Sequence, residues 1–359
     1  GYYQDRTLRN IMKIYHLSHT DLDGYACQFV VNFYFKNVKF YNSNYGKEIN
    51  ENFNSIIGDI EKDENFGKAI ILITDLNLNL NQCEEFEKIC KEKNIKIFLL
   101  DHHQSGEECA QKYSWYLLDS KRCATKIVYD FFSKICTPVL ELSKFVDVVN
   151  AVDIWLSEDE NFELGKVFLG LIANAKEINR VMFKKSQIDY MFFLLDKAWK
   201  FIGKENANIL LDNATHFIKK DYFARKNDDT LSNLISYFVV EKLSELKENF
   251  RVEYEGHKGI LTSNIGNTSV IGNDFLVKNP DYDFFIDISS RKTLSFRANG
   301  KIDVSLMAKN LVGGGGHKNA SGGLFTTFKD GANYNHIKAQ IIDLIKSKEL
   351  KKENNESKQ

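Results

Sequence analysis

Hydrophobic positions in the N-terminal third of the chain alternate between two patterns. Short apolar runs, many of them rich in branched residues, predict buried strands at residues 12–18, 38–41, 69–74, 95–100 and 115–118. Between these runs, apolar residues at helical spacing predict helices at residues 24–35, 49–60 and 83–93. Alternation of strands and helices is typical of an α/β domain with a doubly wound parallel sheet.

The pattern becomes helical after residue 123 and returns to α/β near residue 251. Helices are expected at residues 124–135, at 140–155 and through much of 162–250, because the chain has only 2 prolines to interrupt them. The last third is expected to hold strands at residues 259–263, 282–289 and 294–297 and helices at 304–311 and 337–345. The fold class is therefore α/β, with a doubly wound N-terminal domain, a helical connector and a smaller C-terminal α/β domain.

A chain of 359 residues is also long enough to form two domains, which agrees with this division. The expected division is an extension or expression remnant at 1–11, an N-terminal domain at 12–200, a helical connector at 201–250, a C-terminal domain at 251–349 and a disordered charged tail at 350–359.

Charge and cysteine content restrict the possible partners. The net charge is −1, from 48 basic and 49 acidic side chains, whereas proteins that coat long nucleic acids carry a basic excess. The 6 cysteines form no Cys-x-x-Cys pair, which disfavours a zinc ribbon and fits reduced thiols in the cytoplasm. We see no signal peptide and no apolar run of membrane-spanning length, so we expect no membrane partner.

Carboxylate and imidazole side chains recur where the predicted strands end. His19, Asp21 and Asp23 follow the first strand, Asp75 the third and Asp101-His102-His103 the fourth, and Asp153 lies in a later helix. The carboxyl ends of parallel strands converge in one crevice, where so many carboxylates require cations to offset their repulsion. Each residue alone is an ordinary turn or cap residue, but together they predict a site for hard divalent ions.

These residues carry a resemblance to a known family. The segments His19-Thr20-Asp21-Leu22-Asp23-Gly24 and Asp101-His102-His103, with Asp75 and Asp153, resemble the four motifs of the DHH phosphoesterase superfamily. The segment from Gly313 to Gly323 resembles the glycine signature of the DHH-associated substrate-binding domain. The spacing in His-x-Asp-x-Asp-Gly is most similar to that of the group called oligoribonuclease B, the nanoRNase type.

The resemblance implies a catalytic N-terminal domain that binds two divalent ions, with Mn²⁺ the expected metal. It assigns one ion to His19, Asp21 and Asp75, and the other to Asp23, Asp75, His102 and Asp153. Asp75 would bridge the two ions, and Asp101 would orient a histidine of the triplet. His103 would lie near the phosphate as a hydrogen-bond donor or general acid. The implied catalytic residues are therefore His103, Asp75 and Asp101.

The glycine-rich segment, residues 313–316, is a candidate anion site. It lacks the Gly-Lys-Ser/Thr of a P-loop, but successive glycines expose backbone N–H groups to a ligand. The alternative is an ordinary turn after a helix, for which one glycine is enough. The resemblance implies that substrate is bound by Gly314, Gly315, Gly316, His317 and Arg297. Ala298 stands where relatives often have a serine after the arginine.

Three functions are compatible with these features. The first is a manganese-dependent phosphodiesterase that degrades short single-stranded RNA from its 3′ end to nucleoside 5′-monophosphates. The second keeps the chemistry and changes the substrate to a 3′,5′-bisphosphate nucleotide or a cyclic dinucleotide. The third is a non-catalytic nucleotide-binding module that retains the fold. An oligomer is possible in each case.

Overall fold

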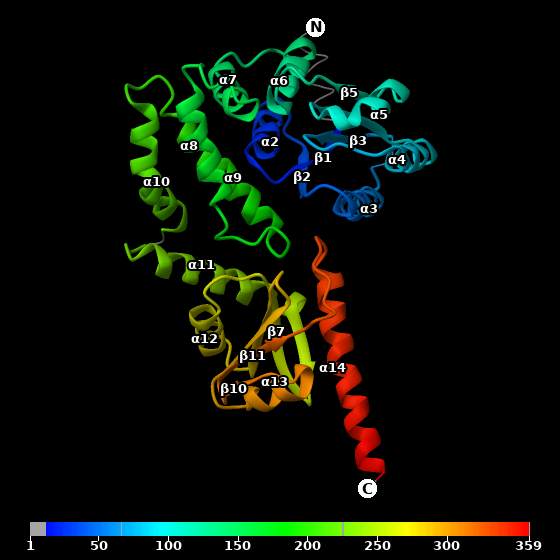
Figure 1. Ribbon diagram of the computed structural model, residues 1–359, viewed down its shortest axis with the longest axis vertical. Coiled ribbons are helices and arrows are strands. Elements are labelled where there is room, and N and C mark those ends of the chain that lie inside the picture. Colours follow the sequence, from blue (N-terminus) through cyan, green and yellow to red (C-terminus); the bar gives the residue numbers. More distant parts are fainter. Residues whose placement is uncertain (1–11, 66, 225, 359) are drawn as a thin grey trace. The chain divides into compact units, whose positions relative to one another are not determined.

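The computed structural model describes residues 12–65, 67–224 and 226–358, and the expected extension at residues 1–11 lies outside them. The chain divides into two compact units, which are described separately. The N-terminal unit runs to residue 176 and includes residues 185–219, and the C-terminal unit comprises residues 177–184 and those from 220 onward. Figure 1 shows the elements of both units along the chain.

A five-stranded parallel sheet forms the centre of the N-terminal unit, in the order β2-β1-β3-β4-β5. Its strands are β1 (Lys13–His19), β2 (Val38–Ser43), β3 (Ala69–Thr74), β4 (Lys96–Asp101) and β5 (Tyr116–Leu118). The helices that alternate with them or follow them are α2 (Leu22–Tyr34), α3 (Lys47–Lys62), α4 (Leu80–Glu92), α5 (Glu107–Lys112) and α6 (Ala124–Ile135).

Helices cover both faces of this sheet (Figure 1). On one face, Leu17, Ile73 and Leu99 pack against α3, α4 and α5 in a continuous hydrophobic core. On the other face, α2 contacts β1, and α6 contacts both α2 and β4. This arrangement confirms the predicted doubly wound parallel sheet.

The strand order places a switch point between β1 and β3, where ligands bind in folds of this kind. Ser18 of β1 pairs with Thr74 of β3, so the two strands end level with each other. The residues that follow these two strands therefore emerge side by side at one edge of the sheet.

The remaining helices of this region are α7 (Leu142–Asp153), α8 (Phe162–Ala173), α9 (Lys184–Trp199) and α10 (Ala207–Phe223). Gly165 allows α8 to approach α7 closely, because a Cβ atom there would lie 2.7 Å from Cβ of Val152. No helix in the parts of the chain that the structure describes is long and apolar enough to cross a membrane.

The C-terminal unit holds a six-stranded mixed sheet in the order β10-β11-β9-β8-β7-β6. Its elements are α11 (Leu231–Glu245), β6 (Arg251–Tyr254), β7 (His257–Ser263), α12 (Thr268–Lys278), β8 (Phe284–Ile288), β9 (Thr293–Ala298), α13 (Val304–Val312), β10 (Gly315–His317), β11 (Ala320–Leu324) and α14 (Tyr334–Ser357). In this sheet β7 and β8 pair in parallel and the other neighbouring strands pair antiparallel. Helix α12 connects β7 to β8 along the chain. Side chains of α13 and α14 share one core with the sheet.

Helix α14 continues to Ser357, so residues 350–357 are helical and the expectation of a disordered tail from residue 350 is wrong for them. The segment contains neither glycine nor proline, and its lysine and glutamate residues have high helix propensity. A charged composition is therefore compatible with an exposed helical end as well as with disorder, and here the segment is helical.

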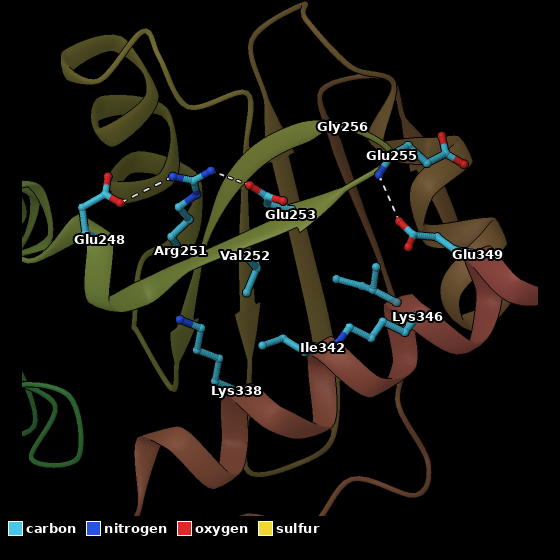
Figure 2. Close-up of a pocket in the computed structure, with 11 residues that line it drawn as sticks. Glu248, Arg251, Val252, Glu253, Glu255, Gly256, Lys338, Ile342, Lys346 and Glu349 are labelled. Atoms are coloured by element: carbon cyan, nitrogen blue, oxygen red, sulfur yellow. Dashed lines mark hydrogen bonds and ion pairs between the residues drawn. The ribbon is translucent and has the colours of Figure 1, made fainter.

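A hollow of about 570 Å³ lies between the edge strand β6 and α14 (Figure 2). Its charged groups largely satisfy one another: Arg251 pairs with Glu248 at 3.6 Å and with Glu253, and Glu349 accepts a hydrogen bond from the N–H of Glu255. Charged side chains on an exposed edge strand hinder pairing with other chains. We therefore interpret this surface as protection of the sheet edge.

Candidate metal centre

The carboxyl ends of β1, β3 and β4 and the end of α7 bring the predicted ligands together within the N-terminal unit. They form three overlapping groups of potential metal ligands: His19, Asp21 and Asp75; Asp23, His102 and Asp153; and Asp75, Asp101, His102 and His103. The ligand atoms within each group lie within 4.8 Å of one another. The convergence expected from the strand ends is thus present in the structure.

The first group surrounds the imidazole of His19. Its Nδ1 atom lies 3.2 Å from Oδ2 of Asp21 and 3.7 Å from Oδ2 of Asp75. Asp21 caps α2 and accepts a hydrogen bond from the N–H of Gly24 at 2.9 Å. Glycine is required at position 24, because a Cβ atom there would lie 2.1 Å from the carbonyl oxygen of His19. The turn that presents this group therefore depends on Gly24.

The second group surrounds Nε2 of His102. This nitrogen lies 3.4 Å from Oδ1 of Asp75, 3.4 Å from Oδ2 of Asp153 and 3.5 Å from Oδ2 of Asp23. Three carboxylates from three separate elements thus face one imidazole.

Asp75 belongs to both groups, and it presents a different oxygen to each. The residue is buried and adopts a φ of 56°, in the left-handed region that residues other than glycine rarely occupy. Its N–H donates to the carbonyl of Leu100 at 3.2 Å, which fixes the turn after β3. Strained backbone of this kind concentrates at functional sites, and here it directs the carboxylate between the two groups.

Asp23 is held by the first turn of α6. Its carboxylate accepts hydrogen bonds from the N–H groups of Ala124 and Thr125 at 3.0 and 2.9 Å and from the Thr125 hydroxyl at 2.6 Å. The positive end of a helix dipole also favours a carboxylate at this place. Thr125 therefore orients a potential ligand, a role that the sequence did not reveal because the two residues lie about a hundred positions apart.

The two histidines of the Asp101-His102-His103 triplet have different contacts. His102 faces the carboxylates, whereas Nδ1 of His103 lies 2.7 Å from Oδ1 of buried Asp101. This hydrogen bond raises the pKa of His103, although burial of the ring opposes it. The other ring nitrogen, Nε2, lies 3.1 Å from the hydroxyl of Tyr45, a residue that the motifs did not indicate.

The electrostatics of the cluster favour a bound cation. Burial, together with the nearby charges of Asp23 and Asp21, raises the pKa of Asp75 well above its usual value and that of Asp153 to about 9. Burial alone would raise the pKa of Asp21 too, but the adjacent His19 imidazole outweighs it and lowers that pKa to about 2. Carboxylates held this close therefore resist ionising together without a compensating positive charge.

The donor atoms also fit a divalent metal. Nδ1 of His19, Oδ2 of Asp75 and Oδ2 of Asp153 are buried and have no hydrogen-bond partner among the described residues. Buried polar atoms are normally satisfied, so unsatisfied atoms pointing into one cluster indicate a missing ligand. Carboxylate and imidazole donors without a thiolate suit Mn²⁺ or a similar ion.

The glycine-rich segment in the C-terminal unit forms part of a β-hairpin. Gly313 ends α13 with a φ of 66°, and β10 then pairs with β11 in an antiparallel ladder. A Cβ atom at Gly314 would lie 2.1 Å from the carbonyl oxygen of Gly322, and one at Gly316 would lie 2.6 Å from that of Ala320. Close backbone packing therefore explains these glycines, while Gly315 and His317 remain exposed.

Arg297 lies on β9 beside the first turn of α12. Its guanidinium donates to the hydroxyl of Ser269 at 3.1 Å and to the carbonyl of Phe296 at 2.9 Å. Its aliphatic stem passes over Gly272, where a Cβ atom would lie 3.1 Å from Cγ of Arg297. Ser269 thus supplies a hydroxyl to the arginine although Ala298 does not.

Comparisons with known proteins identify the family of this chain. The model of the DHH family, N-terminal domain, matches residues 13–149. A Helicobacter pylori protein named 3′,5′-cyclic-nucleotide phosphodiesterase is 41% identical over 347 residues, which cover 93% of this chain and 99% of that protein. The crystal structure of an uncharacterized protein from Helicobacter pylori G27 has a TM-score of 0.86 and 41% identity, covering 93% of this chain and 99% of that one. The chain belongs to the DHH family of phosphoesterases, as its motifs predicted.

Proposed function

We propose that this protein is a divalent-cation-dependent phosphodiesterase that breaks the P–O3′ bond of small 3′,5′-linked nucleotides. The main support is the position of Asp75, whose two carboxylate oxygens face two different groups of potential ligands. Such a carboxylate suits a pair of cations that share one ligand. His19, Asp21 and Asp75 would hold one cation, and Asp23, Asp75, His102 and Asp153 the other.

Two divalent ions bound there would lower the pKa of a water molecule and neutralise charge on the phosphate oxygens. The remaining chemistry belongs to side chains of the protein. Asp101 fixes the Nδ1 side of the His103 imidazole and stabilises its protonated form. His103 thus has one ring nitrogen, Nε2, from which a proton could pass to the departing 3′-oxygen.

A 3′,5′-cyclic nucleotide is the substrate that the comparisons favour. The relative that is 41% identical and aligned over nearly its full length is named for that substrate class. Opening of the ring at P–O3′ would give a nucleoside 5′-monophosphate.

Short RNA is the second candidate substrate, and the sequence itself favours it. The motif that begins at His19 resembles that of oligoribonuclease B, and a net charge of −1 suits short polynucleotides better than long ones. Cleavage at P–O3′ from the 3′ end would again release nucleoside 5′-monophosphates. A 3′,5′-bisphosphate nucleotide and a cyclic dinucleotide contain the same P–O3′ bond and are the remaining candidate substrates.

A substrate panel tests this proposal. The protein is incubated with Mn²⁺ and, separately, with a 3′,5′-cyclic nucleotide, a short RNA labelled at its 5′ end, adenosine 3′,5′-bisphosphate and a cyclic dinucleotide, and products are resolved by chromatography. We expect 5′-phosphorylated products with free 3′-hydroxyls. A ladder shortening from the 3′ end would identify RNA as a substrate, whereas exclusive turnover of a cyclic compound would identify the cyclic class. Products that carry a 3′-phosphate, or binding without turnover of any compound, would contradict the proposal.

The C-terminal unit is proposed to bind substrate through Gly314, Gly315, Gly316, His317 and Arg297. We expect His317→Ala to raise KM about tenfold or more with little change in kcat, since a hydrogen bond to a charged phosphate contributes roughly 1.5–3 kcal/mol. Steady-state kinetics check this, with His336→Ala as the control because His336 is also exposed and lies in the same unit. Equal kinetics for both variants would remove His317 from the substrate site.

A further inference from the structure

Tyr45 connects two parts of the candidate metal centre that the motifs treat separately. It lies in the turn between β2 and α3, and the residue is 44% exposed. Its ring centroid lies 4.4 Å from that of His19, with an interplanar angle of 34°. Its hydroxyl lies 3.1 Å from Nε2 of His103. One side chain therefore contacts a predicted metal ligand and the predicted general acid.

The turn that carries Tyr45 is held in place on both sides. Asn44, the preceding residue, accepts a hydrogen bond from the Thr20 hydroxyl at 2.9 Å, and its N–H donates to Glu48. Gly46, the following residue, has a φ of 86°, and its carbonyl accepts from Gln82 at 3.3 Å. The position of Tyr45 is thus fixed by its neighbours, even though its ring is partly exposed.

The two contacts restrict the two imidazoles in different ways. Asp101 accepts from the Nδ1–H of His103, so Nε2 faces the Tyr45 hydroxyl, accepting from it when the ring is neutral and donating to it when the ring is protonated. With both nitrogens engaged, the His103 ring has one preferred orientation. The Tyr45 ring packs on His19 and so limits rotation of the imidazole whose Nδ1 faces Asp21 and Asp75.

We propose that Tyr45 is a positioning residue of the active site, which orients His103 through its hydroxyl and His19 through its ring. This inference rests on the proposed phosphodiesterase function. The two contacts can be separated experimentally, because phenylalanine keeps the ring and lacks the hydroxyl, whereas alanine lacks both.

Tyr45→Phe and Tyr45→Ala are compared with the wild type in steady-state kinetics and in Mn²⁺ titration calorimetry. We expect Tyr45→Phe to lower kcat about tenfold while KM and Mn²⁺ affinity stay within about twofold, as is typical when an orienting partner is removed. Tyr45→Ala should lower kcat further and also weaken Mn²⁺ binding about tenfold, because the His19 ring loses its support.

Tyr129→Phe is the matched control, because its hydroxyl donates to the carbonyl of Val139, at 3.5 Å, and to no residue of the candidate metal centre among the hydrogen bonds of the described residues. A kcat for Tyr45→Phe equal to that of this control would overturn the hydroxyl role. A rise in KM alone would also overturn it, since that would make Tyr45 a substrate-stacking surface. If the wild type hydrolysed no substrate, the proposed function would fail. The Mn²⁺ titrations would still decide the His19 contact, because equal affinity of the alanine variant would contradict it.

Discussion

Replacement of Asp75 by alanine is expected to abolish cation-dependent hydrolysis, lowering kcat/KM about a thousandfold or more. Asp75 is the one residue that presents an oxygen to both His19 and His102 among the described residues, so its loss affects both proposed cation sites. Paired cations contribute several kcal/mol of transition-state stabilisation, and each 1.4 kcal/mol is about tenfold in rate. The measurement is kcat/KM over a range of Mn²⁺ concentrations, with Mn²⁺ stoichiometry from calorimetry.

Two further variants make this result specific. Asp75→Asn keeps the size of the side chain and should be nearly as inactive, because it lacks the charge. Asp147→Asn is the control, since Asp147 lies on α7 with Asp153 but, within the described part of the chain, forms only an exposed ion pair with Lys126, at 3.5 Å. If Asp75→Ala kept activity within about tenfold of this control, the shared-ligand interpretation would fail.

Removal of divalent cations is expected to destabilise the N-terminal unit, and increasingly so as the pH rises. The pKa of Asp153 is raised to about 9 and that of Asp75 is raised well above its usual value, mainly by burial and then by neighbouring carboxylates. An unfolded aspartate titrates near pH 3.9, so the cation-free fold incurs no penalty from these groups below about pH 4. The penalty grows as the pH rises toward 9, where the folded groups are forced to ionise.

Bound cations remove this penalty, so the difference in melting temperature between Mn²⁺-loaded and chelator-treated protein should widen by roughly 5 °C between pH 5 and pH 9. The pKa shift of Asp21 has the opposite sign to those of Asp75 and Asp153. Because this pKa is about 2, its effect on stability is confined to pH values below about 4, outside this interval. Thermal unfolding followed by circular dichroism measures the difference. Asp153→Asn should reduce the pH dependence in chelator, and a constant difference across the range would refute the electrostatic account.

The sequence predicted the fold of the N-terminal unit because its signals are local. Strands of a parallel sheet are buried on both faces, so they appear in the sequence as branched apolar runs such as Ala69–Thr74. The residues directly after such strands must emerge at one edge of the sheet. The convergence of His19, Asp75 and His102 follows from that geometry alone. Which oxygen of Asp75 faces which group does not follow, because it depends on the unusual backbone of that residue.

The features that the sequence did not predict depend on tertiary contacts. Thr125 reaches Asp23 across about a hundred residues, and Tyr45 lies in a turn with no motif of its own. The β10–β11 hairpin is rich in glycine, which is rare in strands, so local propensity favoured a loop. Its glycines are explained only by the close approach of two backbones, as at Gly314 and Gly322.

Anomalous scattering from crystals grown with Mn²⁺ tests the paired-cation site most directly. We predict two manganese peaks about 3.5–4 Å apart, one coordinated by Oδ2 of Asp75 beside His19 and the other by Oδ1 of Asp75 beside His102. A single peak, or two peaks that Asp75 does not share, would contradict the account.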